Sequence, residues 1–176
     1  MRLAHELKRL GKHSAIYGLG GLVSRILATL LLPLYTHYLP PGSYGRVEVI
    51  TAATAVGAIV LQLGISSAFF RFYFDAKEQA ARLVVIRTSF WFTMAMSTLG
   101  LVLGLVFAHA VAHWLGLGDH PSLVRAGAVG LWAQTNYNQL TALFRVEERS
   151  VQYAMASVAN VLITVVAMVV FVAVFH

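Results

Sequence analysis

The chain has 176 residues, of which 59% are apolar and 11% are charged, with a formal net charge of +6 and a mean hydropathy of +0.73. An average soluble domain has about 25% charged residues, so this composition excludes the charged surface of a soluble protein. The absence of cysteine excludes disulfides and cysteine-ligated metals. The positive charges lie between apolar segments, which favours a topology signal over a nucleic-acid-binding surface.

Five apolar segments follow one another, each long enough to cross the roughly 30 Å hydrocarbon core of a bilayer. The first follows a basic N-terminus and is too long for the apolar part of a signal peptide. The sequence therefore predicts an all-α polytopic membrane protein in which residues 1–176 form a single transmembrane domain. The predicted spans cover approximately residues 14–38, 44–70, 83–108, 122–144 and 151–175.

Arg25 is the one charged residue within the first predicted span. A guanidinium at membrane depth is costly unless it faces protein or water, so Arg25 is a candidate functional residue. It shares a helical face with Gly18, Gly21 and Thr29, and small residues let another helix approach closely. Pro33 removes a backbone hydrogen bond and is expected to bend the helix towards its outer end.

A loop with two prolines and two glycines, residues 39–45, precedes the second span, and Ser43 is its predicted N-cap. Within this span Glu48 and Gln62 lie on one polar face, together with Thr51, Ala52, Ala55 and Ser66. Glu48 is the nearby intramembrane acid with which Arg25 could form a purely structural ion pair. Arg46 points almost opposite to Glu48, and we expect it to snorkel to the membrane interface.

The later spans also carry polar or small residues at helical spacing. In the third span, the stripe of Ser89, Thr93, Ser97, Gly100 and Gly104 predicts a helix-packing face. The fifth span has a similar stripe of Tyr153, Ser157, Asn160, Thr164 and Met168. In the fourth span, Gln134 and Asn138 align with Thr141 and Arg145, while Asn136 lies on the reverse face. These amides are denser than packing requires, so packing and a water-lined cavity both remain open for them.

Lysine and arginine occur in alternate connections, as the positive-inside rule requires for a multi-pass protein. They are concentrated in residues 1–13, 71–87 and 145–149, whereas residues 39–45 and 109–121 contain none. The pattern predicts a cytoplasmic N-terminus and a C-terminus on the outer, periplasmic side of the cell (inner) membrane.

His109 and His113 lie four residues apart, but the HExxH arrangement of a zinc site is not present around them. The sequence contains no recognisable nucleophile with its base, phosphate-binding loop or dinucleotide fingerprint. We therefore expect no metal, no cofactor, no catalytic residues and no enzymatic activity.

The segment from Leu32 to Gly45 reads LPLYTHYLPPGSYG. It resembles the end of the first helix and the first outer loop of polysaccharide (O-antigen type) flippases, which typically read P-L-x-T-x-x-L-x-P-x-x-Y-G. These flippases belong to the multidrug/oligosaccharidyl-lipid/polysaccharide exporter superfamily, which also holds lipid II flippases and multidrug exporters. The similarity continues in order through residues 47–50, 62–68, 71–75 and 142–149.

The resemblance implies a flippase that carries a lipid-pyrophosphate-linked oligosaccharide to the outer leaflet for cell-surface polysaccharide or lipopolysaccharide biosynthesis. Two helical lobes of such a transporter enclose a polar cavity that opens alternately to each side. In this interpretation Arg25 contacts the pyrophosphate, and Gln134 and Asn138 form hydrogen bonds with sugars. Glu48 and Gln62 complete the candidate substrate-binding residues.

The chain departs from that family in length. Its members normally have roughly a dozen or more helices in two lobes, so five spans form only part of an N-terminal lobe. We expect either a truncated product, as the apolar end of the chain favours, or an association with a second polypeptide that supplies further helices. Two alternatives stay open: a fragment of a cation-coupled multidrug exporter, and a non-transporting truncated or accessory membrane protein. A cation-coupled exporter needs acids within the membrane to bind the coupling ion. Glu48 is the one acid within the predicted spans, which counts against this alternative.

Overall fold

The computed structural model describes residues 41–62 and 64–175. These residues form helices joined by short turns, which confirms the predicted all-α class for the described part of the chain. The chain divides into two compact units, residues 36–146 and residues 1–35 with 147–176, and each is described by itself. The candidate residue Arg25 lies outside the described residues.

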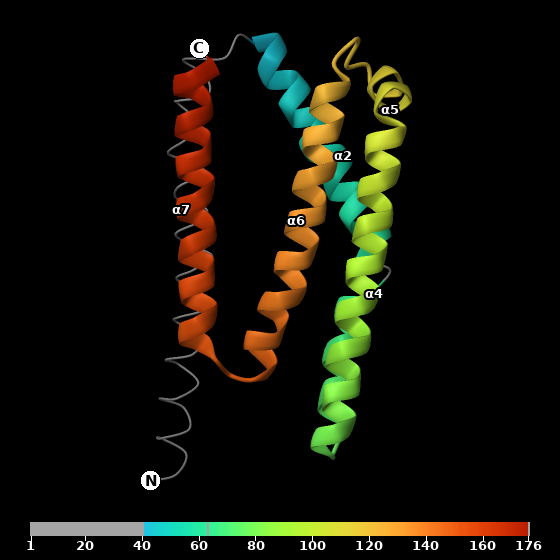
Figure 1. Ribbon diagram of the computed structural model, residues 1–176, viewed down its shortest axis with the longest axis vertical. Helices are drawn as coiled ribbons and strands as arrows, with labels where there is room; N and C mark the ends of the chain where they lie inside the picture. Colours follow the sequence, from blue (N-terminus) through green and yellow to red (C-terminus); the bar gives the residue numbers. More distant parts are fainter. Residues whose placement is uncertain (1–40, 63, 176) are drawn as a thin grey trace. The chain divides into compact units, whose positions relative to one another are not determined.

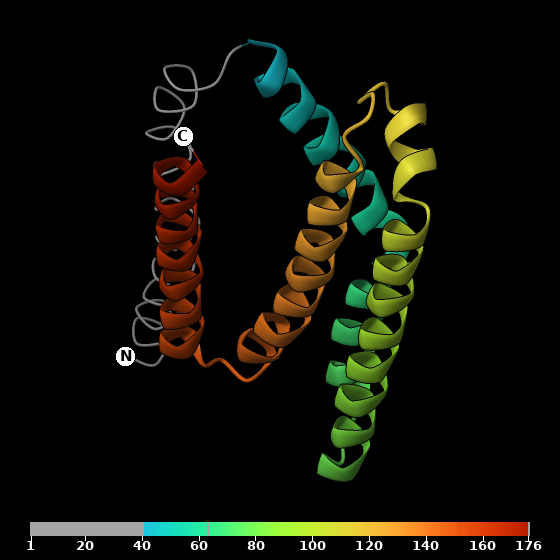
Figure 2. The ribbon, with the colours of Figure 1, turned by 45° about the horizontal axis from the view of Figure 1, so that its top comes forward.

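The described part of the unit of residues 36–146 contains five helices, which are α2 (Pro41–Gln62), α3 (Ile65–Asp75), α4 (Gln79–Val106), α5 (Ala108–Trp114) and α6 (Pro121–Val146). The antiparallel pair α4 and α6 shares the most extensive interface, and α2 packs against α6 and α4 (Figures 1 and 2). In the other unit, the described helix is α7 (Ser150–Phe175), and the ion pair between Arg149 Nε and Glu147 Oε2, at 2.8 Å, precedes it.

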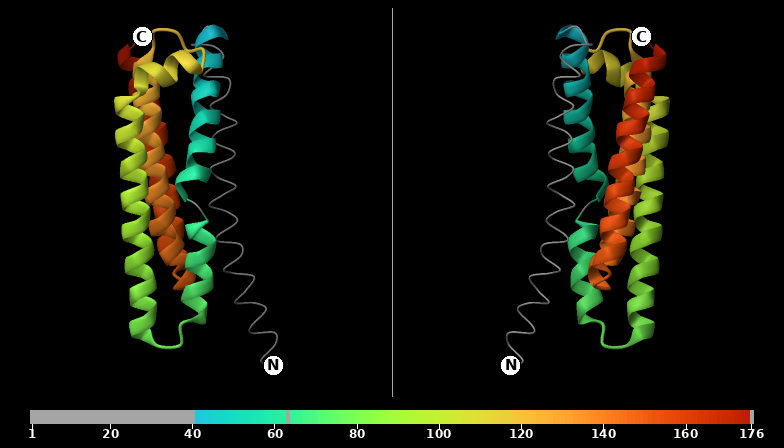
Figure 3. Two further views of the ribbon diagram at one scale, coloured as in Figure 1. Left: turned by 90° about the vertical axis from the view of Figure 1, so that its right-hand side faces the viewer. Right: turned by 90° about the vertical axis from the view of Figure 1, so that its left-hand side faces the viewer.

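The second predicted span, residues 44–70, lies within the apolar stretch Tyr44–Asp75, which is long enough to cross a membrane, but it is not one continuous helix. Gly64 separates α2 from α3 and has a φ of 75° and a ψ of 7°, in the left-handed region. Glycine adopts this conformation without the steric cost of a Cβ, which explains why the helix breaks at this residue. Figure 3 shows α2 and α3 following one another along the same side of the unit.

Replacing Gly64 by alanine is expected to lower the free energy of unfolding by about 1 kcal/mol, because a Cβ is disfavoured at positive φ. The space around Gly64 is open, so the cost is in the backbone rather than in packing. Gly45 is the matched control, because it also lies in open space but is not among the positive-φ residues. Thermal unfolding of both alanine variants checks this, and equal losses would contradict it.

Two regions that the sequence predicted as loops also differ in the structure. Helix α2 begins at Pro41, ahead of the predicted N-cap Ser43, because proline fits the first turn of a helix. Helix α5 covers the first part of residues 109–121, which were predicted as a loop, and it lies across the end of the unit (Figure 3). The glycines Gly116 and Gly118, with φ of 68° and 61°, then turn the chain into α6.

The distribution of side chains in the described residues differs from that of a soluble protein. Large apolar side chains are exposed on the helices, with Ile59 74% and Val106 69% exposed. Polar side chains, including Ser97 at 0% exposure, share the interior with buried apolar residues such as Phe69. Helices that meet in lipid pack small and polar residues together and leave apolar residues outside. Among the described residues, the stretches Tyr44–Asp75, taken across the break, and Gln79–Val106 are long and apolar enough to span a membrane.

Candidate functional site

The predicted packing face of the third span is confirmed, because it forms the contact between α4 and α6. Ser89, Thr93 and Ser97 are buried there. Gln139 Nε2 donates a hydrogen bond to Ser89 Oγ at 3.0 Å, and Asn136 Nδ2 donates one to Ser97 Oγ at 2.9 Å. The Asn136 amide also donates to the carbonyl oxygen of Trp132 at 2.8 Å. Asn136 therefore serves helix packing, as do the buried Ser89 and Gln139.

The hydrogen bond between Asn136 and Ser97 is expected to contribute about 0.6 kcal/mol to stability, the typical coupling between polar side chains of membrane helices. A double-mutant cycle with Asn136→Ala and Ser97→Ala measures this coupling from the unfolding free energies. Gln134 provides the control, since its amide bonds to Asn138 on its own helix rather than to α4. A cycle of Gln134→Ala with Ser97→Ala should show no coupling, and equal values in both cycles would contradict the assignment.

Contacts on both sides of the break at Gly64 show which part of α6 lies beside it. On one side of the break, a Cβ added to Gly57 would lie 3.0 Å from Leu131 Cδ2, so α2 and α6 are in close contact there. On the other side, Phe69 and Tyr73 of α3 form a buried cluster with Ala142 and Val146 of α6. Between these two contacts, α2 and α3 run in the same direction as α6. Gln62 and residues 64–66 are therefore level with the part of α6 between Leu131 and Ala142.

Three of the five candidate residues, Gln62, Gln134 and Asn138, lie at this level. Gln62 Oε1 accepts a hydrogen bond from Ser66 Oγ at 3.3 Å, across the break. Gln134 Nε2 donates one to Asn138 Oδ1 at 2.9 Å. Gln134 is exposed, while Asn138 and Gln62 are half-buried. Each amide carries two donors and two acceptor lone pairs, so the group can bind hydroxyl-rich molecules beyond these internal bonds.

Glu48 does not belong to this group. It lies fourteen residues before Gln62, which places it about 21 Å away along a regular helix. It is exposed and forms a hydrogen bond with the Tyr44 hydroxyl. Arg46 donates a hydrogen bond from Nη1 to His120 Nε2 at 2.5 Å, and its position at the membrane interface stays a prediction. The predicted polar face of α2 therefore does not form one site in the described structure.

The sequence interpretation did not identify Gly64 as part of the site. The signal was available, because an isolated glycine inside an apolar helix often marks a break or a functional position. Discontinuous helices in transporters expose backbone groups at membrane depth and commonly form substrate sites. The candidate site therefore consists of the break at Gly64 and the neighbouring side chains of Gln62, Ser66, Gln134 and Asn138, which we call the amide level.

The family model described as "Polysaccharide biosynthesis protein" matches residues 10–176. Comparisons with curated proteins and with solved structures give no match. Together with the apolar helices, the family match indicates a membrane protein with a role in polysaccharide biosynthesis. Because the match covers nearly the whole sequence, this chain belongs to the polysaccharide biosynthesis protein family.

Proposed function

We propose that this chain is the N-terminal portion of a flippase that moves a lipid-pyrophosphate-linked oligosaccharide across the cell (inner) membrane. The observation that carries the proposal is the family match over residues 10–176. Polysaccharide repeat units built on a lipid carrier in the cytoplasm need a protein that takes their polar head through the bilayer. Such a role requires polar groups at membrane depth, where they are otherwise costly.

The amide level supports a sugar-binding role within this proposal. Gln134 and Asn138 would donate and accept hydrogen bonds with sugar hydroxyls, and Gln62 would do so from α2. The helix break at Gly64 would let α2 and α3 move separately as the cavity opens to one side and then the other. Arg25 would hold the pyrophosphate, because a guanidinium pairs with phosphate oxygens through two parallel hydrogen bonds.

The proposal includes a five-span topology with the N-terminus in the cytoplasm, and transport rather than an enzymatic reaction. It also includes a second set of helices that closes the cavity. A second polypeptide, or further residues of the same protein, would supply them. Membrane lipids and the lipid-linked oligosaccharide are the proposed partners.

The test compares cells with and without the gene for the transport of their own lipid-linked oligosaccharide. In right-side-out membrane vesicles, a membrane-impermeant reagent such as periodate modifies only sugars that have reached the outer leaflet. We expect the modified fraction to fall in vesicles from the deletion strain and to recover when the gene returns. If the modified fraction is the same in both strains, the chain does not translocate this substrate.

The same vesicles separate transport from an accessory role in assembly. An accessory protein would change the amount of finished surface polysaccharide while leaving the outward-facing fraction of the lipid-linked precursor unchanged. That pattern would overturn the flippase proposal. Accumulation of precursor on the cytoplasmic side of the deletion strain would support it.

A further inference from the structure

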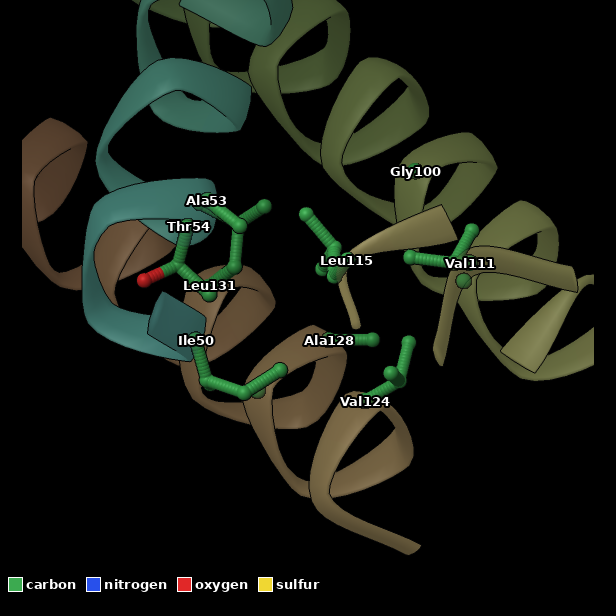
Figure 4. Close-up of a pocket in the computed structure, with 11 residues that line it drawn as sticks. Ile50, Ala53, Thr54, Gly100, Val111, Leu115, Val124, Ala128 and Leu131 are labelled. Carbon is green, nitrogen blue, oxygen red and sulfur yellow. The ribbon is translucent and has the colours of Figure 1, made fainter. Parts of the chain in front are cut away.

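Helix α5 crosses one end of the unit (Figure 3), and an apolar crevice lies there (Figure 4). Its volume is about 140 Å³, and its walls come from α2, α4, α5 and α6. Figure 4 shows side chains from several helices converging on it, including Ile50, Thr54, Val111, Leu115, Val124 and Leu131. The Thr54 hydroxyl bonds to the carbonyl oxygen of Thr51 at 2.9 Å, so it does not offer the crevice a free donor. An apolar cavity of about this size, roughly 150 Å³, can hold a benzene ring.

Glycines in the wall of this crevice let the surrounding helices pack close together. A Cβ at Gly104 would lie 2.6 Å from Ala128 Cβ, and one at Gly127 would lie 2.9 Å from Ile50 Cγ2. A larger side chain at either glycine would collide with the facing helix. These close helix contacts therefore form the crevice, and Val111 of α5 and Leu115, which follows α5 directly, form part of its wall.

A cationic group lies one helical turn from the crevice. Arg46 precedes the wall residue Ile50 by four residues on α2, so both share one face of that helix. Its guanidinium bonds to His120, which directly precedes the start of α6. One bond to His120 occupies one of five N–H donors, and the others suit a phosphate. The nearby acids are Asp119, exposed beside His120, and Glu48, which lies about 200° around the helix from Arg46.

The same end of the unit carries the features of a membrane–water interface. Trp114, the last residue of α5, is 84% exposed. Exposed tryptophan side chains gather at the level of lipid headgroups, where the indole ring meets both apolar and polar surroundings. A lipid whose headgroup lies beside Arg46 would direct its hydrocarbon chain towards Ile50 and Val124.

We propose that this crevice binds one acyl chain of an anionic phospholipid, whose phosphate contacts Arg46. This bound lipid is separate from the transported oligosaccharide, and its site lies away from the amide level. The apolar wall excludes charged ligands from the interior, while the arginine at its mouth favours an anionic headgroup over a zwitterionic one.

The test uses the full chain in nanodiscs made from equal amounts of phosphatidylglycerol and phosphatidylcholine. Native mass spectrometry after release counts the lipids that stay bound and identifies them by mass. We expect the unmodified chain to retain phosphatidylglycerol. Ala53→Phe, which fills the crevice, should lower the retained amount at least about tenfold, because several methylene groups lose their apolar site. The matched control is Ala52→Phe, because Ala52 is the exposed neighbour of Ala53 on α2.

Two further measurements keep the proposal falsifiable if Ala53→Phe does not fold. Arg46→Gln should remove the preference for phosphatidylglycerol over phosphatidylcholine in the same assay. A phosphatidylglycerol analogue with a diazirine in its acyl chain should label residues 50–54 and 111–115 of the unmodified chain. Equal labelling of the exposed Ile59 and Val60 would overturn the proposal. So would a cross-link from a photoreactive residue at position 53 to residues 14–38, because the chain itself would then cover the crevice.

Discussion

Cells carrying Arg25→Ala are expected to translocate the lipid-linked oligosaccharide at least about tenfold more slowly than cells with the unmodified protein. A hydrogen bond to a charged group contributes about 1.5–3 kcal/mol, and each 1.4 kcal/mol corresponds to a factor of ten. In a low-dielectric cavity the arginine would offset much of the cost of moving a pyrophosphate through the bilayer. The measurement is the rate at which sugars become accessible to periodate in right-side-out vesicles.

Two controls separate the charge of Arg25 from its role in folding. Arg25→Lys keeps the positive charge but loses the paired hydrogen bonds. Its transport rate should therefore fall between those of the unmodified protein and of Arg25→Ala. The amount of each variant in the membrane, measured by immunoblot, must match the unmodified protein. If Arg25→Ala reaches the membrane and transports at the unmodified rate, Arg25 is not the pyrophosphate contact. Its role would then be structural, such as an ion pair.

Gly104→Ala is expected to destabilise the protein by about 1–3 kcal/mol, the usual cost of overpacking a close contact. A Cβ at Gly104 would lie 2.6 Å from Ala128 Cβ. Ala128 has no flexible side chain that could move aside, so α4 and α6 themselves must separate. The hydrogen bonds of Ser97 and Ser89 with α6 would lengthen as a consequence. Thermal unfolding should show a Tm lower by roughly 3–10 °C.

Gly130→Ala is the matched control, and the sign of its effect should be opposite. Gly130 lies on α6, is exposed, and has open space where a Cβ would be. Alanine there should gain about 0.5–1 kcal/mol, because glycine in a helix interior loses more conformational entropy on folding. If Gly104→Ala also stabilises the protein, the close contact between α4 and α6 does not form as described.

The packing face of the third span could be predicted from the sequence because it depends only on helical periodicity. Ser89, Thr93 and Ser97 recur every four residues among apolar ones, and small residues are the ones that let helices approach each other. The fourth span was harder to interpret. Gln134, Asn136 and Asn138 are similar in type, and the sequence left packing and a cavity open for all three. The structure separates them, because Asn136 alone of these three faces α4.

Some features depended on long-range contacts that no local pattern contains. Six of the seven residues of α5 lie in a predicted loop, and the buried residues Ala108 and Ala112 of this helix pack in a cluster with Leu117 and Val124. An isolated helix of this length is unstable in water, so tertiary packing stabilises it. The hydrogen bond between Arg46 and His120 joins residues 74 positions apart, so no local pattern in the sequence could predict it.

The sequence by itself determined the all-α class, the apolar segments and the family, because composition, periodicity and the LPLYTHYLPPGSYG segment are local properties of the chain. Tertiary structure decided which polar residues serve packing and which remain available to a ligand. It brought Gln62 level with Gln134 and Asn138 beside the break at Gly64, and it placed Glu48 elsewhere. The physical reason is that a helical stripe specifies which residues share a face, whereas the neighbour of that face depends on how distant helices pack.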